Sequence, residues 1–474
     1  MSPTTRRILL SCFVISAVAC ICLSLLSITG AGVIFLSPAL STEITKFSDA
    51  TPTRPTIPTT TPSAPEPGTA EATPGGSLPP EVSSQMDAIE QQVIDMRELE
   101  PEQSVSRVLM SPEELHERVV NDFFKEYTTE DAKDEAIELG AFGLLDPDFD
   151  LYQLYIDLYT EQVAGFYDDD ENAMYVIRGE GFTAIERMTY AHEYVHALQD
   201  QNFDFDEELN FNEEDCEEDA ERCTAVRALL EGDASMLELQ WLYTYATAED
   251  FTAIQDYYGS LDFPVFDNAP EFLKDSFTFP YDSGTAFVQS LLGTGGLEAI
   301  DQAFQDPPVT TEQILHPERY PDDQPIPVTL PDLGPVLGEG WREINRQIMG
   351  EFATYLILAK GRDPSARIDE EVARVAAEGW GGDAYAVYAN DQDGSSALVM
   401  TTVWDRNSDA DQFAEAFNQF ASARFGNPAL DEGGVTTWQS NEGYTEFHHS
   451  EGTTTWIFAP NAETAAELWR LVSQ

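Results

Sequence analysis

The residues at 192–196 combine the side chains of a metal site with a nearby base, in the order His-Glu-Tyr-Val-His. On a helix, residues four apart lie one turn above each other, so His192 and His196 face one point and Glu193 projects beside them. Two imidazoles placed in this way bind zinc, and the carboxylate is positioned to take a proton from a water at the metal. The alternative is two helix histidines without metal, but the chain has only six histidines. A chance HExxH then has odds of roughly one in a hundred.

A catalytic zinc also needs a third protein ligand and an open position for water. Asn202 stands where an HExxHxxGxxH site would have its last histidine, so we expect a carboxylate ligand on a later helix. Residues 225–239 are predicted to form that helix. Glu231 lies in it among apolar residues, where an unpaired carboxylate would be costly and a metal would remove the cost. The alternative is a buried ion pair with Arg227, four residues earlier.

The helix that must carry the two histidines has its own start signal. Thr183 and Glu186 form a capping box, and apolar residues follow at helical spacing: Ile185, Met188, Val195 and Leu198. Ahead of it, residues 163–167 and 173–177 are predicted to form a hairpin joined across an acidic turn.

The N-terminal part of the chain predicts an anchor and a stalk. Residues 8–36 are almost continuously apolar behind Arg6 and Arg7, which favours an uncleaved transmembrane helix with everything after it on the outer side. The alternative is a lipoprotein cleavage box ending at Cys20, but the chain stays apolar beyond it. Residues 37–80 are rich in Thr and Pro and are predicted to be an extended stalk.

The remaining chain is predicted to fold in three parts. Residues 81–131 show helical periodicity and form either a helical cover or a prosegment. Residues 132–362 alternate helices with the hairpin and form the catalytic domain. Residues 363–474 change character and form a small separate α+β domain. Its predicted strands are 383–389, 396–403, 434–439, 445–449 and 453–458, with helices at 410–424 and 462–472.

The charge balance restricts the partners. The formal net charge is −62, from 86 acidic and 24 basic residues. Phosphates would be repelled, so the sequence argues against nucleic-acid binding. Acidic runs at 168–171 and 213–215 are interpreted as solvated loops that keep the protein soluble. The alternative is Ca²⁺ binding, although no EF-hand spacing supports it.

Cys216 and Cys223 are the only cysteines after the apolar N-terminal segment. Their close spacing in an acidic loop, outside the cytoplasm, predicts a disulfide that pins the loop. Two free thiols are the alternative.

The residues at 191–201, together with Glu231-Gly232-Asp233-Ala234, resemble the gluzincin metallopeptidases, and most of all their uncharacterised extracytoplasmic bacterial members. The resemblance extends over residues 161–297. It implies one zinc per chain held by His192, His196 and Glu231, with Glu193 as general base in the hydrolysis of a peptide or protein substrate.

Residues 279–284 are similar to the PYxxG element of gluzincins of the alanyl aminopeptidase and leukotriene hydrolase type. The resemblance implies that Tyr281 donates a hydrogen bond to the oxyanion, a role that suits a neutral donor near zinc. A tyrosine capping a core helix is the alternative. The GAMEN-like aminopeptidase element is absent, so we expect an endopeptidase. In the family layout, residues 173–177 would be the edge strand that pairs with the substrate backbone.

Two further polar residues are left with open roles. Asp200 matches the aspartate of thermolysin-like HExxHxxxD sequences and is either a group that orients a ligand histidine or an exposed helix residue. His316 is either a second oxyanion donor or subsite residue, or a loop histidine before Pro317. Asp233 is assigned no role.

The sequence therefore predicts an α+β protein. A mostly helical, zincin-type catalytic domain with a small antiparallel sheet precedes a C-terminal α+β domain, and both stand behind an N-terminal transmembrane helix. The expected function is that of a membrane-anchored, extracytoplasmic zinc endopeptidase. The alternatives are a zincin-fold binding protein without turnover and a purely structural cell-surface protein.

Overall fold

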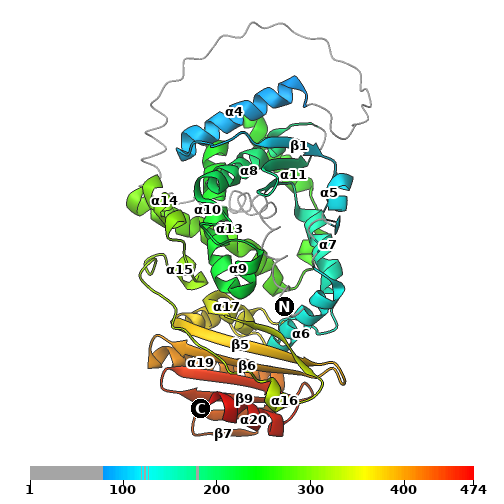
Figure 1. Ribbon diagram of the computed structural model, residues 1–474, viewed down its shortest axis with the longest axis vertical. Coiled ribbons are helices and arrows are strands. Elements are labelled where there is room, and N and C mark those ends of the chain that lie inside the picture. Colours follow the sequence, from blue (N-terminus) through cyan, green and yellow to red (C-terminus); the bar gives the residue numbers. More distant parts are fainter. Residues whose placement is uncertain (1–77, 119, 122–123, 126, 178–180) are drawn as a thin grey trace.

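The computed structural model describes residues 78–474 except 119, 122–123, 126 and 178–180. The expected anchor at 8–36 and almost all of the expected stalk at 37–80 lie outside the described residues. Among the helices that are described, none has both the length and the apolar composition needed to cross a bilayer. The fold is α+β: Figure 1 shows a helical part above a large twisted sheet.

The helical part contains α4 (Pro80–Arg97), β1 (Ser106–Met110), α5 (Pro112–Arg118), α6 (Thr129–Phe142), α7 (Leu151–Gln162), β2 (Gly165–Asp168), β3 (Ala173–Ile177), α8 (Ala184–Phe203), α9 (Glu213–Glu218), α10 (Ala220–Tyr245), α11 (Ala248–Ser260), α12 (Pro264–Asp267), α13 (Glu271–Gly295), α14 (Leu297–Gln305) and α15 (Thr311–Leu315). The sheet part contains α16 (Gly334–Leu337), β4 (Trp341–Gln347), α17 (Gly350–Ala359), α18 (Glu370–Ala377), β5 (Trp380–Asn390), β6 (Ser396–Trp404), α19 (Asn407–Phe425), β7 (Leu430–Glu432), β8 (Val435–Gln439), β9 (Tyr444–Ser450), β10 (Thr453–Ala459) and α20 (Ala462–Val472).

The small sheet beside the histidine helix differs from the expected one. Its strand order is β1-β3-β2, with β1 parallel and β2 antiparallel to β3. The predicted hairpin is confirmed by the antiparallel pairing of β2 with β3, but the parallel strand β1 makes the sheet mixed instead of antiparallel. The third strand comes from residues 106–110, inside the segment 81–131 that was predicted to form a helical cover or a prosegment. Because β1 takes one side of β3, residues 173–177 are the central strand, and the expectation that they form the substrate edge is wrong.

The large sheet has the order β4-β5-β6-β10-β9-β8-β7, and all of its neighbours are antiparallel. It includes β4 at 341–347, so the sheet begins before residue 363, where the sequence placed the start of the domain. Alternate residues of β5 face opposite sides, as the period of a strand requires. Tyr385 and Val387 pack in a core with α6, α17 and α19, whereas Ala386 and Tyr388 pack with α16 and α20.

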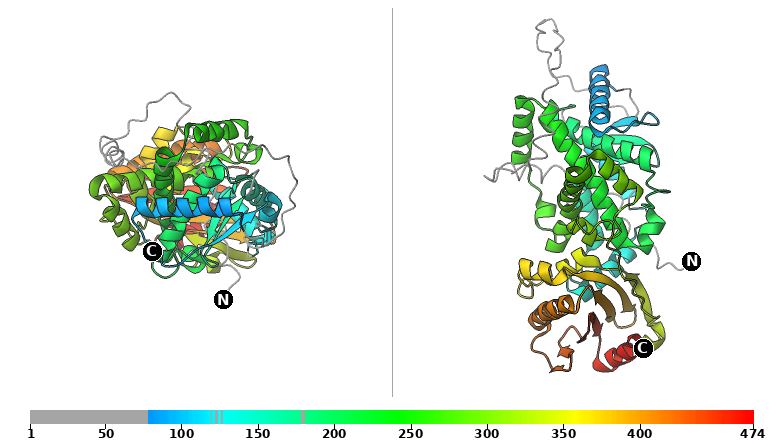
Figure 2. Two further views of the ribbon diagram at one scale, coloured as in Figure 1. Left: turned by 90° about the horizontal axis from the view of Figure 1, so that it is seen from above. Right: turned by 90° about the vertical axis from the view of Figure 1, so that its left-hand side faces the viewer.

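Helices α8, α10 and α13 form the centre of the helical part, and α4 lies across its end, away from the large sheet (Figure 2). The predicted start of α8 is confirmed, since the Thr183 N–H donates to the Glu186 carboxylate at 2.8 Å. Met188, Val195 and Leu198 are buried against α10 and α4 in one apolar core. This core fixes the face of α8 that carries His192 and His196.

Candidate metal centre

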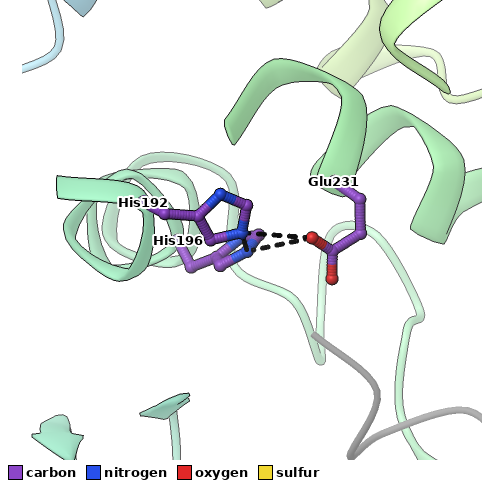
Figure 3. Close-up of side chains that lie close together, drawn as sticks. All are labelled: His192, His196 and Glu231. Atoms are coloured by element: carbon purple, nitrogen blue, oxygen red, sulfur yellow. Dashed lines mark hydrogen bonds and ion pairs between the residues drawn. The ribbon is translucent and has the colours of Figure 1, made fainter. Parts of the chain in front are cut away.

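Three side chains from two helices converge at the middle of the helical part. His192 and His196 lie one turn apart on α8, and Glu231 reaches them from α10 (Figure 3). The two Nε2 atoms are 3.1 Å apart, and Glu231 Oε2 lies 3.2 Å from His192 Nε2 and 3.5 Å from His196 Nε2. Two ligands about 2.1 Å from a tetrahedral zinc are about 3.4 Å apart. The triangle of ligand atoms therefore has the size that zinc requires.

The other ring nitrogens of the two histidines are held by acceptors. Gln199 Oε1 lies 2.8 Å from His196 Nδ1, in a hydrogen bond. Glu238 Oε2 lies 3.1 Å from His192 Nδ1, which is an ion-pair distance without hydrogen-bond geometry. Such acceptors favour the proton on Nδ1, which leaves both Nε2 lone pairs facing each other and the carboxylate of Glu231. Three electron pairs that face one another across about 3 Å repel unless a cation lies between them.

Glu231 gives a second sign that a cation belongs here. It is buried, and its Oε1 atom has no hydrogen-bond partner among the described residues. Burial alone would raise its pKa, but protons on the two imidazoles, in place of a metal ion, attract the carboxylate and lower the pKa of Glu231 to about 2. An ionised, half-satisfied buried carboxylate is a good metal ligand. The alternative partner, Arg227, instead places its guanidinium over the ring of Phe211, 5.7 Å from the centroid.

Glu193 is the fourth polar group of the site and is also buried. Its Oε2 atom accepts a hydrogen bond from the Tyr167 N–H of β2 at 3.0 Å. Burial raises the pKa of Glu193 to about 7, with a smaller upward contribution from Glu231, while His192 and His196 act in the opposite direction. A zinc ion in the triangle would lower this pKa, so the carboxylate would be ionised and able to accept a proton.

Tyr281 is placed by the crossing of two helices. It is buried on α13, one turn before Gly284, which lies against the backbone of Ala228 and Gly232 on α10. Gly232 directly follows the ligand Glu231 in the sequence. Tyr281 thus belongs to the core around α10, and its contact with an oxyanion remains a prediction.

The remaining sequence candidates have other partners. Asp200 accepts a hydrogen bond from the Tyr167 hydroxyl at 2.8 Å, so the histidine-orienting role falls to Gln199 and Glu238. His316 Nε2 lies 2.9 Å from Glu351 Oε1 on α17. Gln199 and Glu238, which orient the histidines, belong to no motif that the sequence analysis singled out. Gln199 is one turn past His196, and Glu238 is two turns past Glu231.

The acidic runs at 168–171 and 213–215 supply no ligand to this centre. Neither run contributes to a group of three ligand side chains in the part of the chain that the structure describes. A second acidic group, Glu312, Asp323 and Asp405, surrounds the guanidinium of Arg319, which already supplies a cation. Calcium binding therefore remains a prediction without a defined site.

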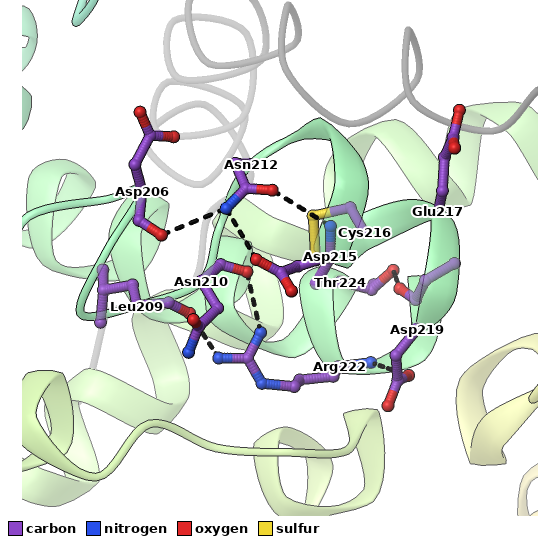
Figure 4. Close-up of a disulfide and its surroundings, with 12 residues drawn as sticks. Asp206, Leu209, Asn210, Asn212, Asp215, Cys216, Glu217, Asp219, Arg222 and Thr224 are labelled. Carbon is purple, nitrogen blue, oxygen red and sulfur yellow. Dashed lines mark hydrogen bonds between the residues drawn. A yellow bond between two sulfur atoms is a disulfide. The ribbon is translucent and has the colours of Figure 1, made fainter. Parts of the chain in front are cut away.

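The disulfide between Cys216 and Cys223 is present and joins α9 to the first turn of α10 (Figure 4). Around it, Arg222 donates to the carbonyl oxygens of Leu209 and Asn210, and Asn212 caps α9 by accepting from the Asp215 N–H. The acidic loop is thus tied to the start of the helix that carries Glu231.

Comparison with known proteins gives one match. Residues 337–469 match a family described as a domain of unknown function (DUF8575). The matched stretch contains all seven strands of the large sheet and lies outside the residues of the metal centre. No curated protein and no solved structure matches the chain.

Proposed function

We propose that this protein is a zinc-dependent metallopeptidase in which His192, His196 and Glu231 hold one zinc ion and Glu193 is the general base. The observation that carries the proposal is the buried triangle of ligand atoms, with sides of 3.1, 3.2 and 3.5 Å. Its second support is the acceptor beside each Nδ1 atom, since these acceptors leave both Nε2 atoms as ligands.

Bound zinc would supply a Lewis acid that polarises a water and the substrate carbonyl. Glu193 takes the proton of the attacking water and delivers it to the leaving amine. Tyr281 donates its hydroxyl hydrogen to the oxyanion that forms on the carbonyl. Gln199 and Glu238 keep the two imidazoles in the orientation that leaves Nε2 available.

The substrate backbone is proposed to lie along β2 instead of β3. Strand β2 is at the edge of the small sheet, and the Tyr167 N–H points from this strand to Glu193. That N–H does not pair with β3 and instead donates to Glu193. The outer edge of β2 therefore lies beside the general base. An extended peptide bound there would have its carbonyl groups beside the metal centre, which favours an endopeptidase.

The proposed location is the outer face of a cell membrane, with the apolar segment 8–36 as a single-pass anchor. Arg6 and Arg7 before this segment give the orientation. The disulfide between Cys216 and Cys223 supports an oxidising compartment.

Metal analysis of the full chain in detergent tests the proposal. We expect one zinc per chain in the wild type and none in His196→Ala or Glu231→Ala. His316→Ala is the matched control, because it removes a histidine that is paired with Glu351 outside the triangle. A folded wild type without zinc would overturn the proposal. Zinc without hydrolysis of any peptide in a broad library would leave a zincin-fold binding protein.

A further inference from the structure

Arg97, the last residue of α4, is completely buried beside the metal centre. Its Nε atom donates to Asp233 Oδ2 at 3.0 Å, and one terminal nitrogen lies 2.7 Å from Asp301 Oδ1 on α14. A buried guanidinium loses its hydration and is stable only among such carboxylates. Arg97 therefore ties the N-terminal helix to α10 and α14 by charge.

A path of hydrogen bonds continues from Arg97 to a metal ligand. Asp233 Oδ2 accepts from Gln199 Nε2 at 2.9 Å, and Gln199 Oε1 lies 2.8 Å from His196 Nδ1. Gln199, Asp233 and Arg97 are all fully buried. The path thus joins α4, α10 and α8 through side chains that water does not reach.

The chemistry of the path fixes the tautomer of His196. Gln199 Nε2 faces two acceptors, Asp233 Oδ2 and the Leu230 carbonyl at 3.1 Å, so the amide must present its NH₂ group to them. Its oxygen is then directed at His196 Nδ1 and accepts the ring proton. The Nε2 lone pair is left for the metal. Arg97 holds the Asp233 carboxylate, which fixes the orientation of the Gln199 amide.

We propose that Arg97 is a positioning residue of the metal centre and that α4 is a permanent part of the folded protein rather than a removable prosegment. The inference rests on the proposed function. It agrees with the packing of α4, whose Met86, Ile89 and Val93 are buried in the same core as α8 and α10. It also agrees with the hydrogen bond from Trp241 Nε1 to Gln92 Oε1 at 2.8 Å.

Cobalt and zinc binding by the full chain tests the role of Arg97. We expect Arg97→Met to weaken the affinity for both ions by about 10- to 100-fold and to change the visible absorption of bound Co²⁺, because a ligand imidazole loses its orientation. Arg342→Met is the matched control: it takes an arginine from Asp134, which is also buried, in the region of the large sheet. That variant should keep the affinity and the spectrum of the wild type.

The outcomes separate the two proposals. Arg97→Met with wild-type affinity and spectrum would overturn this inference alone. A wild type that takes up neither ion would overturn the proposed function, and the role of Arg97 with it. If Arg97→Met does not fold, the double variant Arg97→Met/Asp233→Asn removes both buried charges and still offers Gln199 an acceptor. We expect it to fold and to recover most of the affinity; a double variant that folds but binds no ion would overturn the path through Asp233.

Mass analysis of the zinc-loaded protein from its native cells tests the role of α4 separately. We expect the mature chain to retain residues 80–97. A zinc-loaded, active form that begins after Arg97 would overturn the inference.

Discussion

Gly232 meets Gly284 where helix α10 crosses helix α13: a Cβ atom on Gly232 would lie 2.3 Å from the carbonyl carbon and oxygen of Gly284. Both neighbours are backbone atoms, so no side chain can turn aside to relieve the contact. The close approach of the two helices thus depends on the absence of a side chain directly after the ligand Glu231.

Gly232→Ala is expected to force the helices apart. The overpacking should lower the free energy of unfolding by at least about 1–3 kcal/mol and displace Glu231 enough to weaken zinc binding. Thermal unfolding and metal content measure the two effects. Gly293→Ala is the control on α13, because its Cβ would meet nothing within 4 Å. Equal stability and zinc content in both variants would contradict the close crossing of α10 and α13.

Glu193→Gln should keep the zinc and lose the activity. The amide has nearly the shape of the carboxylate, but it cannot accept the proton of the attacking water. We expect peptide hydrolysis to fall by about 10²- to 10⁴-fold or more. Metal content and turnover of a fluorogenic peptide, measured on the same preparation, check both halves of the prediction. Activity near that of the wild type would remove Glu193 from the role of base.

Glu238→Ala should weaken zinc binding although Glu238 is not a ligand. Its Oε2 atom lies 3.1 Å from His192 Nδ1, and loss of such a partner typically costs 10- to 100-fold in metal affinity. Competition with a chelator of known affinity gives the dissociation constant. Glu249→Ala, which removes an exposed glutamate of α11, is the control. An unchanged affinity in Glu238→Ala would show that α8 alone orients His192.

Stability should decrease with rising pH because of a buried carboxyl group between the helical part and the large sheet. Burial raises the pKa of Glu221 from 4.5 to about 8, helped by Asp383 and Asp219 and opposed by hydrogen bonds from Thr311. The folded state therefore holds a proton that the unfolded state releases above pH 4.5. Its contribution to stability is complete below that pH and is lost as the pH rises through about 8.

Urea unfolding between pH 5 and pH 8 measures this effect. Loss of the Glu221 proton should lower the free energy of unfolding by up to about 1.4 kcal/mol per pH unit. Glu221→Gln keeps the shape of the side chain without the titration and should have a flatter pH profile. The same slope in both proteins would assign the pH dependence to other groups.

Local patterns were sufficient to predict many of the elements. The start of α8, the disulfide and five strands of the large sheet are all encoded within short stretches of sequence. The missed strands lack such a pattern. Strand β1 is only partly buried, β4 is mostly polar with the sequence WREINRQ, and β7 has only three residues. These strands form because a neighbouring strand offers them hydrogen bonds, which periodicity cannot reveal.

The residues of the candidate site also differ in whether the local sequence reveals them. His192 and His196 are related by helical spacing, and Glu231 was found because a charged residue stood in an apolar run. Glu238 could not be assigned in advance, because its contact with His192 depends on how α8 packs against α10. Gln199 lies one turn after His196 on the same helix, so helical spacing could have indicated it. Arg97 is 136 residues from its partner Asp233, and only the tertiary structure brings the two together.

The attachment of α6 to the large sheet has a consequence for the order of folding. Asp134 binds Arg342, 208 residues later, and the Gly140 carbonyl accepts from Arg424, 284 residues later. A ribosome has completed most of the chain before these partners exist, so α6 remains without them through most of synthesis. Contacts of such long sequence separation form slowly, because closing the intervening loop costs entropy. Chains that end before β4 should therefore leave the sheet-facing side of α6 uncovered and become targets of quality-control proteases.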